Sequence, residues 1–324
     1  MKILITGGVG FIGTNATIYF SKDKKNQVVL VDNFSRYGVK INADFLKKNY
    51  PKIKIIESSV INIKNYQKEI ITSDAVIHLA GQTAVTTSIK KPRYDFKNNL
   101  YESFTLLEYL RKINYQGTIL YSSTNKVYGD LSHIKKNQYK PIDESEKLDF
   151  ISPYGCSKGA TDLYFLDYNR IYGIKTVVFR QSCIYGPHQF GVEDQGWVAH
   201  FSKQFILKKP ITIFGDGKQI RDLLYVEDLI KAYELAIKKI DTVKGQAFNI
   251  GGGIKNAYSL TEVIRFLEKK IGYKVKINYK KMRIGDQKYF VSANKKIKKF
   301  LDWQPTVDFK NGIEKLIDWQ KENL

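Results

Sequence analysis

Apolar residues gather in short runs through the first half of the chain, and polar stretches separate them. Valine, isoleucine and leucine occupy both alternations of these runs, a pattern typical of strands buried on both faces. Most intervening stretches have helical spacing, such as residues 96–112 and 154–172. The alternation predicts an α/β fold with a doubly wound parallel sheet. The predicted strands are KILIT (2–6), QVVLVD (27–32), KIKII (52–56), DAVIHLA (74–80), GTILYSS (117–123) and KTVVFR (175–180).

The rhythm of apolar positions changes after about residue 180. Shorter strands are predicted there, and they mix with helical segments. We therefore expect a first lobe over residues 1–180 and a smaller α/β lobe over 181–324, and leave open a crossing of the chain between them. The predicted strands are ITIF (211–214), AFNI (247–250) and KVKINY (274–279), and the predicted helices span 226–240, 259–271 and 309–324.

Composition excludes several classes of protein. With 43% hydrophobic residues, 26% charged residues and seven prolines, the chain is neither disordered nor collagen-like. No apolar run reaches the roughly 18 residues that span a bilayer, so no contact with a membrane is expected. The chain opens directly on a strand and has two cysteines, so we expect a reduced, cytoplasmic setting. Its four widely separated histidines predict no metal site.

The net charge of +21 comes from 53 Lys and Arg residues against 32 Asp and Glu residues. Such a charge raises the question of nucleic-acid binding. Only eight of the basic residues are arginine, however, whereas base and phosphate readout favour arginine. Lysines also recur in nearly every segment. We therefore interpret the charge as a generally lysine-rich surface and expect no nucleic-acid partner.

Three glycines, Gly7, Gly10 and Gly13, follow the first predicted strand and lead into a helix near Phe11. Glycines so placed allow a tight turn, a close approach of the backbone to a pyrophosphate, and close packing of helix on strand. The helix N-terminus attracts the phosphates. Asp32 ends the second strand, where a carboxylate would hold the adenosine ribose and repel a 2′-phosphate. The pattern predicts a dinucleotide site that prefers NAD over NADP, and the nearby Arg36 weakens that preference.

The GxxGxxG spacing of these glycines resembles that of the extended short-chain dehydrogenase/reductase family, which has a Rossmann-type fold and includes nucleotide-sugar epimerases and dehydratases. His78-Leu79-Ala80-Gly81 is similar to the family's stretch at the end of the fourth strand. Ser59 stands where the family usually has an aspartate that binds the adenine amino group, which implies a weaker contact. The resemblance implies that NAD is bound by Gly7, Gly10, Phe11, Ile12, Gly13, Asp32, Asn33, Ser35, Arg36, Ser59, Leu79, Ala80, Gln82, Asn99, Ser122, Tyr154 and Lys158.

Tyr154 and Lys158, in SPYGCSKGA, are four residues apart and share one face of a predicted helix. A free phenol has a pKa of about 10, and a nearby ammonium together with the positive nicotinamide lowers it. The pair would then accept a proton from a sugar hydroxyl while a hydride leaves the same carbon. Thr124 occupies the family's Ser/Thr position, which implies that its hydroxyl relays the proton. The predicted catalytic residues are Thr124, Tyr154 and Lys158.

The residues after Thr124 bear on the type of reaction. Dehydratases of the family place an acidic pair there to protonate the departing hydroxyl. This chain has Asn125 and Lys126 instead, so the elimination of water lacks its general acid. The resemblance therefore favours an epimerase.

SSTNKVYGDL (122–131), SPYGCSKGA (152–160) and GKQIRD (217–222) are similar to the family members that act on carbon 2 of a CDP-linked dideoxyhexose. The implied reaction converts CDP-paratose to CDP-tyvelose through a transient 2-keto sugar. The hydride returns to the sugar, so NAD is expected to stay tightly bound. The resemblance implies substrate contacts from Gln82, Thr124, Asn125, Lys126, Gln189, Arg221 and Arg283.

Two other functions stay open at this point. A UDP-hexose 4-epimerase or a related nucleotide-sugar epimerase would use Thr124, Tyr154 and Lys158 equally well. A regulator that senses dinucleotide without chemistry would be expected to lose the Tyr154 and Lys158 pair, and both are present. Members of the family usually pair through a helix bundle, so a homodimer or homotetramer is expected by analogy of fold.

Overall fold

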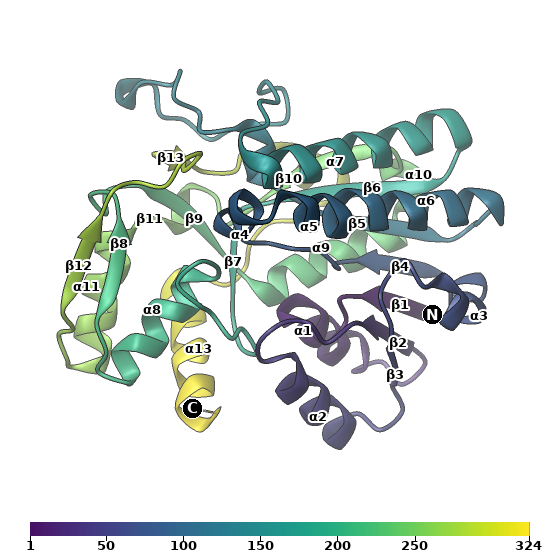
Figure 1. The fold of residues 1–324 in the computed structure, drawn as a ribbon, viewed down its shortest axis with the longest axis horizontal. Coiled ribbons are helices and arrows are strands. Elements are labelled where there is room, and N and C mark those ends of the chain that lie inside the picture. The colour runs from purple at the N-terminus through teal and green to yellow at the C-terminus, as the bar shows by residue number, and fades with distance from the viewer. Residues whose placement is uncertain (324) are drawn as a thin grey trace.

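The computed structural model describes residues 1–323, and its largest layer is a seven-stranded sheet in the order β10-β6-β5-β4-β1-β2-β3 (Figure 1). Every pair in this sheet is parallel, which confirms the predicted α/β class. Its strands are β1 (Lys2–Thr6), β2 (Gln27–Asp32), β3 (Lys54–Glu57), β4 (Ala75–His78), β5 (Thr118–Thr124), β6 (Lys175–Gln181) and β10 (Gln246–Ile250).

Helices cover both faces of this sheet. Figure 1 shows α6 (Glu102–Lys112) and α7 (Ser152–Tyr172) on one side, and α1 (Phe11–Phe20) and α2 (Val39–Asn49) on the other. Alternate residues of β1 enter different cores: Ile3 and Ile5 pack on the α1 side, and Leu4 packs on the α6 side. This explains why apolar residues fill both alternations of the strands. Among residues 1–323, no helix is both long and apolar enough to cross a membrane.

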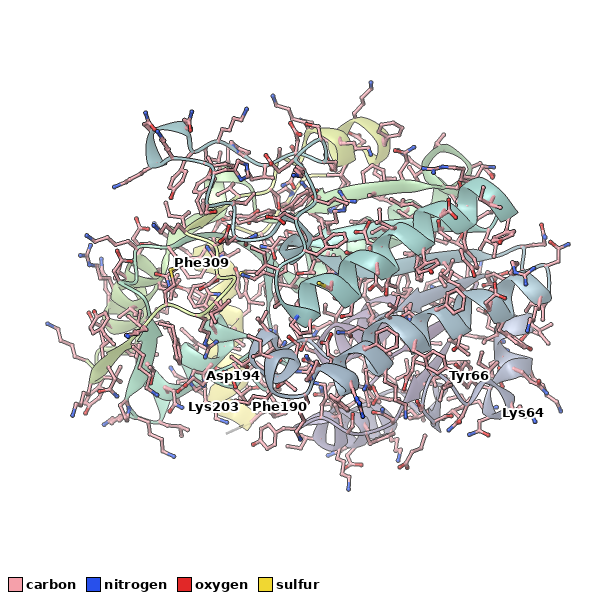
Figure 2. The ribbon with its side chains drawn as sticks, turned by 45° about the horizontal axis from the view of Figure 1, so that its top comes forward. Lys64, Tyr66, Phe190, Asp194, Lys203 and Phe309 are labelled. Atoms are coloured by element: carbon pink, nitrogen blue, oxygen red, sulfur yellow. The ribbon has the colours of Figure 1, made fainter. Side chains whose placement is uncertain are left out.

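The second lobe contains two smaller sheets. In one, β8 (Ile211–Phe214) pairs with β12 (Ile277–Lys280). In the other, β9 (Ile220–Tyr225) pairs with β7 (Cys183–Tyr185), β11 (Ala257–Ser259) and β13 (Tyr289–Phe290). A separate apolar core holds this lobe together, and Phe309, labelled in Figure 2, lies within it. The lobe's helices are α8 (Trp197–Ile206), α11 (Leu260–Ile271) and α13 (Phe309–Asn323); Leu324, the last residue of the predicted helix, lies outside the described residues.

The chain crosses between the lobes. The AFNI segment, which the sequence places in the second lobe, is instead part of β10 and pairs in parallel with β6 of the large sheet. Helix α9 (Val226–Lys238) likewise packs against α1 and joins the core of the first lobe. The division at residue 180 therefore stays a prediction from sequence, while the expectation that AFNI belongs to the second lobe is wrong.

The predicted helix over residues 96–112 is interrupted. It consists of α5 (Pro92–Phe96), a π turn over Lys97–Tyr101, and α6. Such π turns are rare and often occur at functional sites. The remaining helices are α3 (Gln67–Ile71), α4 (Val85–Lys90), α10 (Ile240–Val243) and α12 (Lys295–Leu301), with 3₁₀ turns at Ile63–Asn65, Asn125–Tyr128, Lys136–Gln138 and Ile254–Asn256.

Candidate active site

The carboxyl ends of the central strands meet at one edge of the large sheet, where ligands bind in doubly wound folds. Three adjoining cavities lie there. The glycine cavity, about 400 Å³, surrounds the turn after β1. The tyrosine cavity, about 230 Å³, lies beside Tyr154. The arginine cavity, about 260 Å³, reaches Arg221 and Arg283 in the second lobe. In Figure 2, Phe190 and Asp194, which both line the glycine cavity, are labelled close together near the junction of the lobes.

The glycine turn forms a cradle of backbone. Gly7 has a φ of +68°, and a Cβ there would lie 2.8 Å from the Ala80 nitrogen. A Cβ on Gly13 would lie 2.5 Å from the Gly8 carbonyl oxygen. Helix α1 begins directly after Gly10, and no side chain caps its first turn. Backbone N–H groups and the helix N-terminus thus face the cavity, and this arrangement fits the pyrophosphate of a dinucleotide.

Asp32 ends β2 in the wall of the glycine cavity, with 9% of its surface exposed. Its Oδ1 accepts a hydrogen bond from the Phe34 nitrogen (2.9 Å) and its Oδ2 one from the Val9 nitrogen (3.2 Å). Burial raises the pKa of this carboxyl, and these backbone donors oppose the shift. Arg36, on the same wall, donates to Gln195. The carboxylate is thus held in place where a ribose would lie.

The structure brings nearly all the predicted cofactor residues together. Asn99 differs from the others, because it is 1% exposed and lies behind the loop that follows β4. A Cβ on Gly81 would lie 2.6 Å from the Asn99 Oδ1, so the Asn99 side chain packs closely against that loop. The residues that line the glycine or tyrosine cavity are Gly7, Gly10, Phe11, Ile12, Gly13, Asp32, Asn33, Ser35, Arg36, Ser59, Leu79, Ala80, Gln82, Ser122, Tyr154 and Lys158.

Thr124, Tyr154 and Lys158 meet in the tyrosine cavity. Helix α7 carries Tyr154 and Lys158 one turn apart, and β5 ends at Thr124. All three side chains are buried. The Lys158 ammonium donates to the Ser122 carbonyl (2.5 Å) and lies 4.3 Å from the centre of the Tyr121 ring. Its position is therefore fixed by β5 as well as by α7.

Burial shifts the pKa values of both Tyr154 and Lys158. Burial raises the pKa of Tyr154 to about 12, and a hydrogen bond from Thr124 opposes the shift. Burial lowers the pKa of Lys158 to about 7, against the charges of Asp162 and Asp95. In the protein alone, desolvation therefore outweighs the other influences on both groups, and the lowering of the phenol pKa by Lys158 together with the positive nicotinamide stays a prediction. Burial disfavours the charged form of each group, because both side chains are shielded from water.

Asp286 joins two of the predicted substrate residues in the arginine cavity. Its Oδ1 accepts from Arg221 (2.7 Å) and from Lys126 (3.1 Å). Burial alone would raise the pKa of this carboxyl, but the two cations hold it at about 2. Arg283 pairs with Asp194 (2.8 Å), and its guanidinium lies 3.8 Å from the centre of the Phe214 ring. The cationic side chains of this cavity are therefore held in place by the carboxylates of Asp286 and Asp194.

All seven predicted substrate residues line a cavity. Thr124, Asn125, Lys126, Arg221 and Arg283 line the arginine cavity, while Gln82 lines the glycine cavity and Gln189 the tyrosine cavity.

Sequence reasoning missed further residues in these walls, notably Asp286 and Gln219. Cys183 also lines two of the cavities. Gln219 lies within the GKQIRD motif, and Asp286 follows Arg283 by three positions, so both stood beside residues already singled out. Within residues 1–323, no group of three His, Cys, Asp or Glu residues is placed to hold a metal ion.

Comparison with known proteins identifies the family. A model described as "NAD dependent epimerase/dehydratase family" matches residues 3–251. The chain belongs to this family. It is 43% identical to the CDP-paratose 2-epimerase of Salmonella typhi over 96% of this chain and 97% of that one. It is 32% identical to a putative UDP-glucose 4-epimerase of Methanocaldococcus jannaschii, over 99% of each chain.

A solved structure in the family gives the same picture. The UDP-glucuronic acid 4-epimerase of Bacillus cereus, in complex with UDP-glucuronic acid and NAD, is 30% identical and covers 100% of each chain with a TM-score of 0.88. These findings confirm the resemblance drawn from the motifs, the predicted fold and the predicted cofactor, NAD. They also confirm the enzyme class: the protein is an NAD-dependent isomerase, an epimerase of nucleotide sugars.

Proposed function

We propose that this protein inverts carbon 2 of CDP-paratose to give CDP-tyvelose, with no net oxidation or reduction. The observation that carries this proposal is the 43% identity with a CDP-paratose 2-epimerase over almost the full length of both chains. The geometry of the site supports it, because the tyrosine cavity shares lining residues with both the glycine cavity and the arginine cavity. A sugar placed between the two would lie beside Thr124 and Tyr154.

Bound NAD would supply the acceptor and later the donor of a hydride, held by the glycine turn and Asp32. The residues of the chain handle the proton. Thr124 contacts the Tyr154 phenol and lines both cavities on the sugar side, so it can pass a hydroxyl proton to Tyr154. Lys158 lies one turn away and stabilises the phenolate when it is itself charged. Return of the proton to the sugar oxygen completes the reaction.

The arginine cavity suits the diphosphate of the substrate. Arg221, Lys126 and Arg283 all line it, and a guanidinium can bind two phosphate oxygens at once. Asp286 holds the first two of these cations close together. We propose that these residues bind the diphosphate, and that Gln189 contacts the sugar from the tyrosine cavity.

Dehydratase chemistry does not suit this site. Asn125, which follows Thr124, is engaged with Gln287, to whose Oε1 it donates (3.3 Å). The Lys126 ammonium takes the place of the acidic residue, and it donates to Asp286 (3.1 Å) and to the Gly285 carbonyl (3.2 Å). The neighbouring Asp286 has a pKa of about 2, so it is ionised at neutral pH. A general acid for the departure of water must carry a proton at working pH. These residues therefore favour epimerisation.

Gln219 supports cytosine as the base. This side chain lines the arginine cavity and is 6% exposed. Its Nε2 donates to the Phe214 carbonyl (2.7 Å), and within residues 1–323 its Oε1 has no hydrogen-bond partner. An amide oriented in this way offers an acceptor. Cytosine carries an amino donor at its position 4, where uracil carries an acceptor oxygen. We propose that Gln219 distinguishes CDP-sugars from UDP-sugars.

This assignment is tested with Gln219→Leu, which keeps the bulk and removes the acceptor. We expect KM for the CDP-sugar to rise about tenfold, since one hydrogen bond to a buried group is lost, with little change in kcat. Gln204→Leu is the matched control, because the Gln204 Oε1 is also buried without a partner in residues 1–323 and the residue lies outside the three cavities. Equal KM values for wild type and Gln219→Leu would contradict the assignment.

The main experiment incubates the purified protein separately with CDP-paratose and with UDP-glucose and follows the ring protons by NMR. We expect inversion at carbon 2 of the CDP-sugar without added cofactor. Inversion at carbon 4 of UDP-glucose alone would instead favour a UDP-hexose 4-epimerase. Denaturing the protein and analysing the released nucleotide tests the tight binding of NAD, and a protein that releases none and requires added cofactor would contradict it.

We also propose that the protein forms a homodimer or homotetramer through the outer face of α7. Leu163, Tyr164, Ile171 and Tyr172 expose between 41% and 61% of their surface on this helix. Large apolar side chains gathered in this way often mark contact surfaces between proteins. Light scattering coupled to size exclusion tests the proposal, and Leu163→Lys with Ile171→Lys should give monomers. A wild-type protein that elutes as a monomer would contradict it.

A further inference from the structure

Asp95, on α5, is a buried carboxylate close to the catalytic residues. None of its surface is exposed. Its Oδ2 accepts a hydrogen bond from the Ser157 hydroxyl (2.6 Å). Its Oδ1 accepts from the Gln82 amide (2.8 Å) and from the Asn99 amide (3.0 Å). These three hydrogen bonds stabilise the buried carboxylate, because an unsatisfied charge in the interior would destabilise the fold.

The three donors come from three segments around the site. Gln82 lies in the loop after β4 and lines the glycine cavity. Ser157 lies on α7, between Tyr154 and Lys158. Asn99 lies in the π turn and supports Gly81 from below. Asp95 therefore connects the wall of the cofactor cavity to the catalytic turn of α7.

Among residues 1–323, Asp95 makes no direct ion pair, because all three donors are neutral groups. The other carboxylate that acts on Lys158 is Asp162, and Arg180 pairs with it through two bonds (2.9 and 3.0 Å). The titratable groups whose pKa values the charge of Asp95 affects are Lys158 and Tyr154 from α7 and Tyr121 from β5. Burial raises the pKa of Asp95, while its three donors and the charge of Lys158 favour the carboxylate. The negative charge so retained acts mainly on the catalytic pair.

We propose that Asp95 is a positioning residue, which supplies the counter-charge to Lys158 and holds the Gln82 loop at a fixed spacing from the catalytic turn of α7. The proposal rests on the roles proposed above for Tyr154 and Lys158. A negative charge favours the protonated forms of both the amine and the phenol. Its removal should therefore shift both titrations to lower pH.

The test replaces Asp95 with asparagine, which keeps the shape and removes the charge. The pH at which Lys158 becomes half reactive toward acetic anhydride is measured by competitive labelling and peptide mass analysis. In the wild type we expect a midpoint near the pKa of about 7. In Asp95→Asn we expect a midpoint lower by at least about half a pH unit, kcat lower by about tenfold, and KM changed less than about threefold.

Ser157→Ala is the matched control, because it cuts the bond to α7 and leaves the charge. We expect an unchanged labelling midpoint and a kcat reduced by about threefold. An unchanged midpoint in a folded Asp95→Asn variant would overturn the proposal. If that variant does not fold, an unchanged kcat in Ser157→Ala would overturn it. Labelling needs no turnover, so a wild-type protein that is inactive on CDP-paratose refutes the proposed substrate and leaves this test intact.

Discussion

The Thr124 hydroxyl, at the end of β5, makes several polar contacts at once. It contacts the Tyr154 phenol. It also accepts from the Lys126 nitrogen (3.2 Å) and donates toward the Asn125 Oδ1 (3.4 Å). The same oxygen thus caps the turn after β5 and faces the proposed sugar site. One residue thus combines a structural role with the proposed role in proton transfer.

Replacement of Thr124 separates these roles. We expect Thr124→Ser to keep kcat within about threefold of wild type, and Thr124→Val, which has the same shape without the hydroxyl, to lower kcat by about 10²-fold. NAD binding, measured by the nucleotide retained after purification, should be equal in both variants. A valine variant as active as the serine variant would show that the hydroxyl is not part of the proton path.

At the scale of elements, the turn between β1 and α1 depends on the absence of side chains. We expect Gly13→Ala to weaken NAD binding by at least about tenfold, because a Cβ 2.5 Å from the Gly8 oxygen pushes α1 away from the strand. Gly173→Ala, at the end of α7, is the control. Unlike Gly13, it has a positive φ (+70°), and no atom of residues 1–323 lies within 4 Å of the position of its Cβ.

The control variant should lose about 1 kcal/mol of stability through backbone strain and bind NAD normally. Isothermal titration after removal of endogenous nucleotide gives both affinities. Equal weakening in the two variants would mean that general destabilisation, and not the shape of the turn, controls binding.

The His78 side chain, at the end of β4, bonds to β1 and to α6, and its burial makes the protein sensitive to acid. His78 bonds through Nδ1 to the Thr6 hydroxyl (2.7 Å) and through Nε2 to the Ser103 hydroxyl (2.9 Å). Burial lowers its pKa to about 3, against an ordinary value of 6.5. Below pH 6.5 the unfolded chain binds a proton that the folded chain does not, so acid favours unfolding.

We expect the free energy of unfolding to fall as the pH is lowered from 6.5 to 5, by about 2 kcal/mol from His78 alone. His188, whose pKa burial lowers to about 4, adds to the effect. Urea titrations at pH 7 and pH 5 measure the change, and His78→Gln should show about 2 kcal/mol less pH dependence than wild type. The same pH dependence in both proteins would contradict this account.

At the scale of the whole molecule, we expect the net charge of +21 to affect how fast the protein meets its anionic substrate more than how specifically it binds it. We propose that the glycine turn and cavity residues such as Arg221 and Arg283 bind the phosphates specifically. Many lysines elsewhere on the surface produce a long-range field that attracts an anionic nucleotide sugar. This field is screened over about 10 Å at 0.1 M salt.

We therefore expect kcat/KM for the nucleotide sugar to fall severalfold between about 0.02 and 0.2 M NaCl, because of this screening. The change should appear in KM, with kcat constant. Sucrose at equal viscosity controls for diffusion. A kcat/KM value independent of salt would show that the surface charge does not steer the substrate.

The amino-acid sequence by itself determined the parallel sheet, the glycine turn and the Thr124, Tyr154 and Lys158 set. Local patterns predict these features: apolar runs, glycine spacing, and residues one helical turn apart. Parallel strands place their carboxyl ends at one edge, so loops that carry such motifs converge without further information. For this reason, all but one of the predicted site residues line the three cavities.

Only the tertiary structure decided which buried charges meet and where β10 belongs. Asp286 pairs with Lys126 across 160 positions, and Asp95 bonds Ser157 across 62. No periodicity links residues so far apart, and a lone aspartate in sequence looks the same on a surface as in a core. The pKa of Tyr154 also depends on the tertiary structure, because its shift is set by how fully the folded chain excludes water from the phenol. Burial and long-range pairing are properties of the folded chain, and here they set the electrostatics of the site.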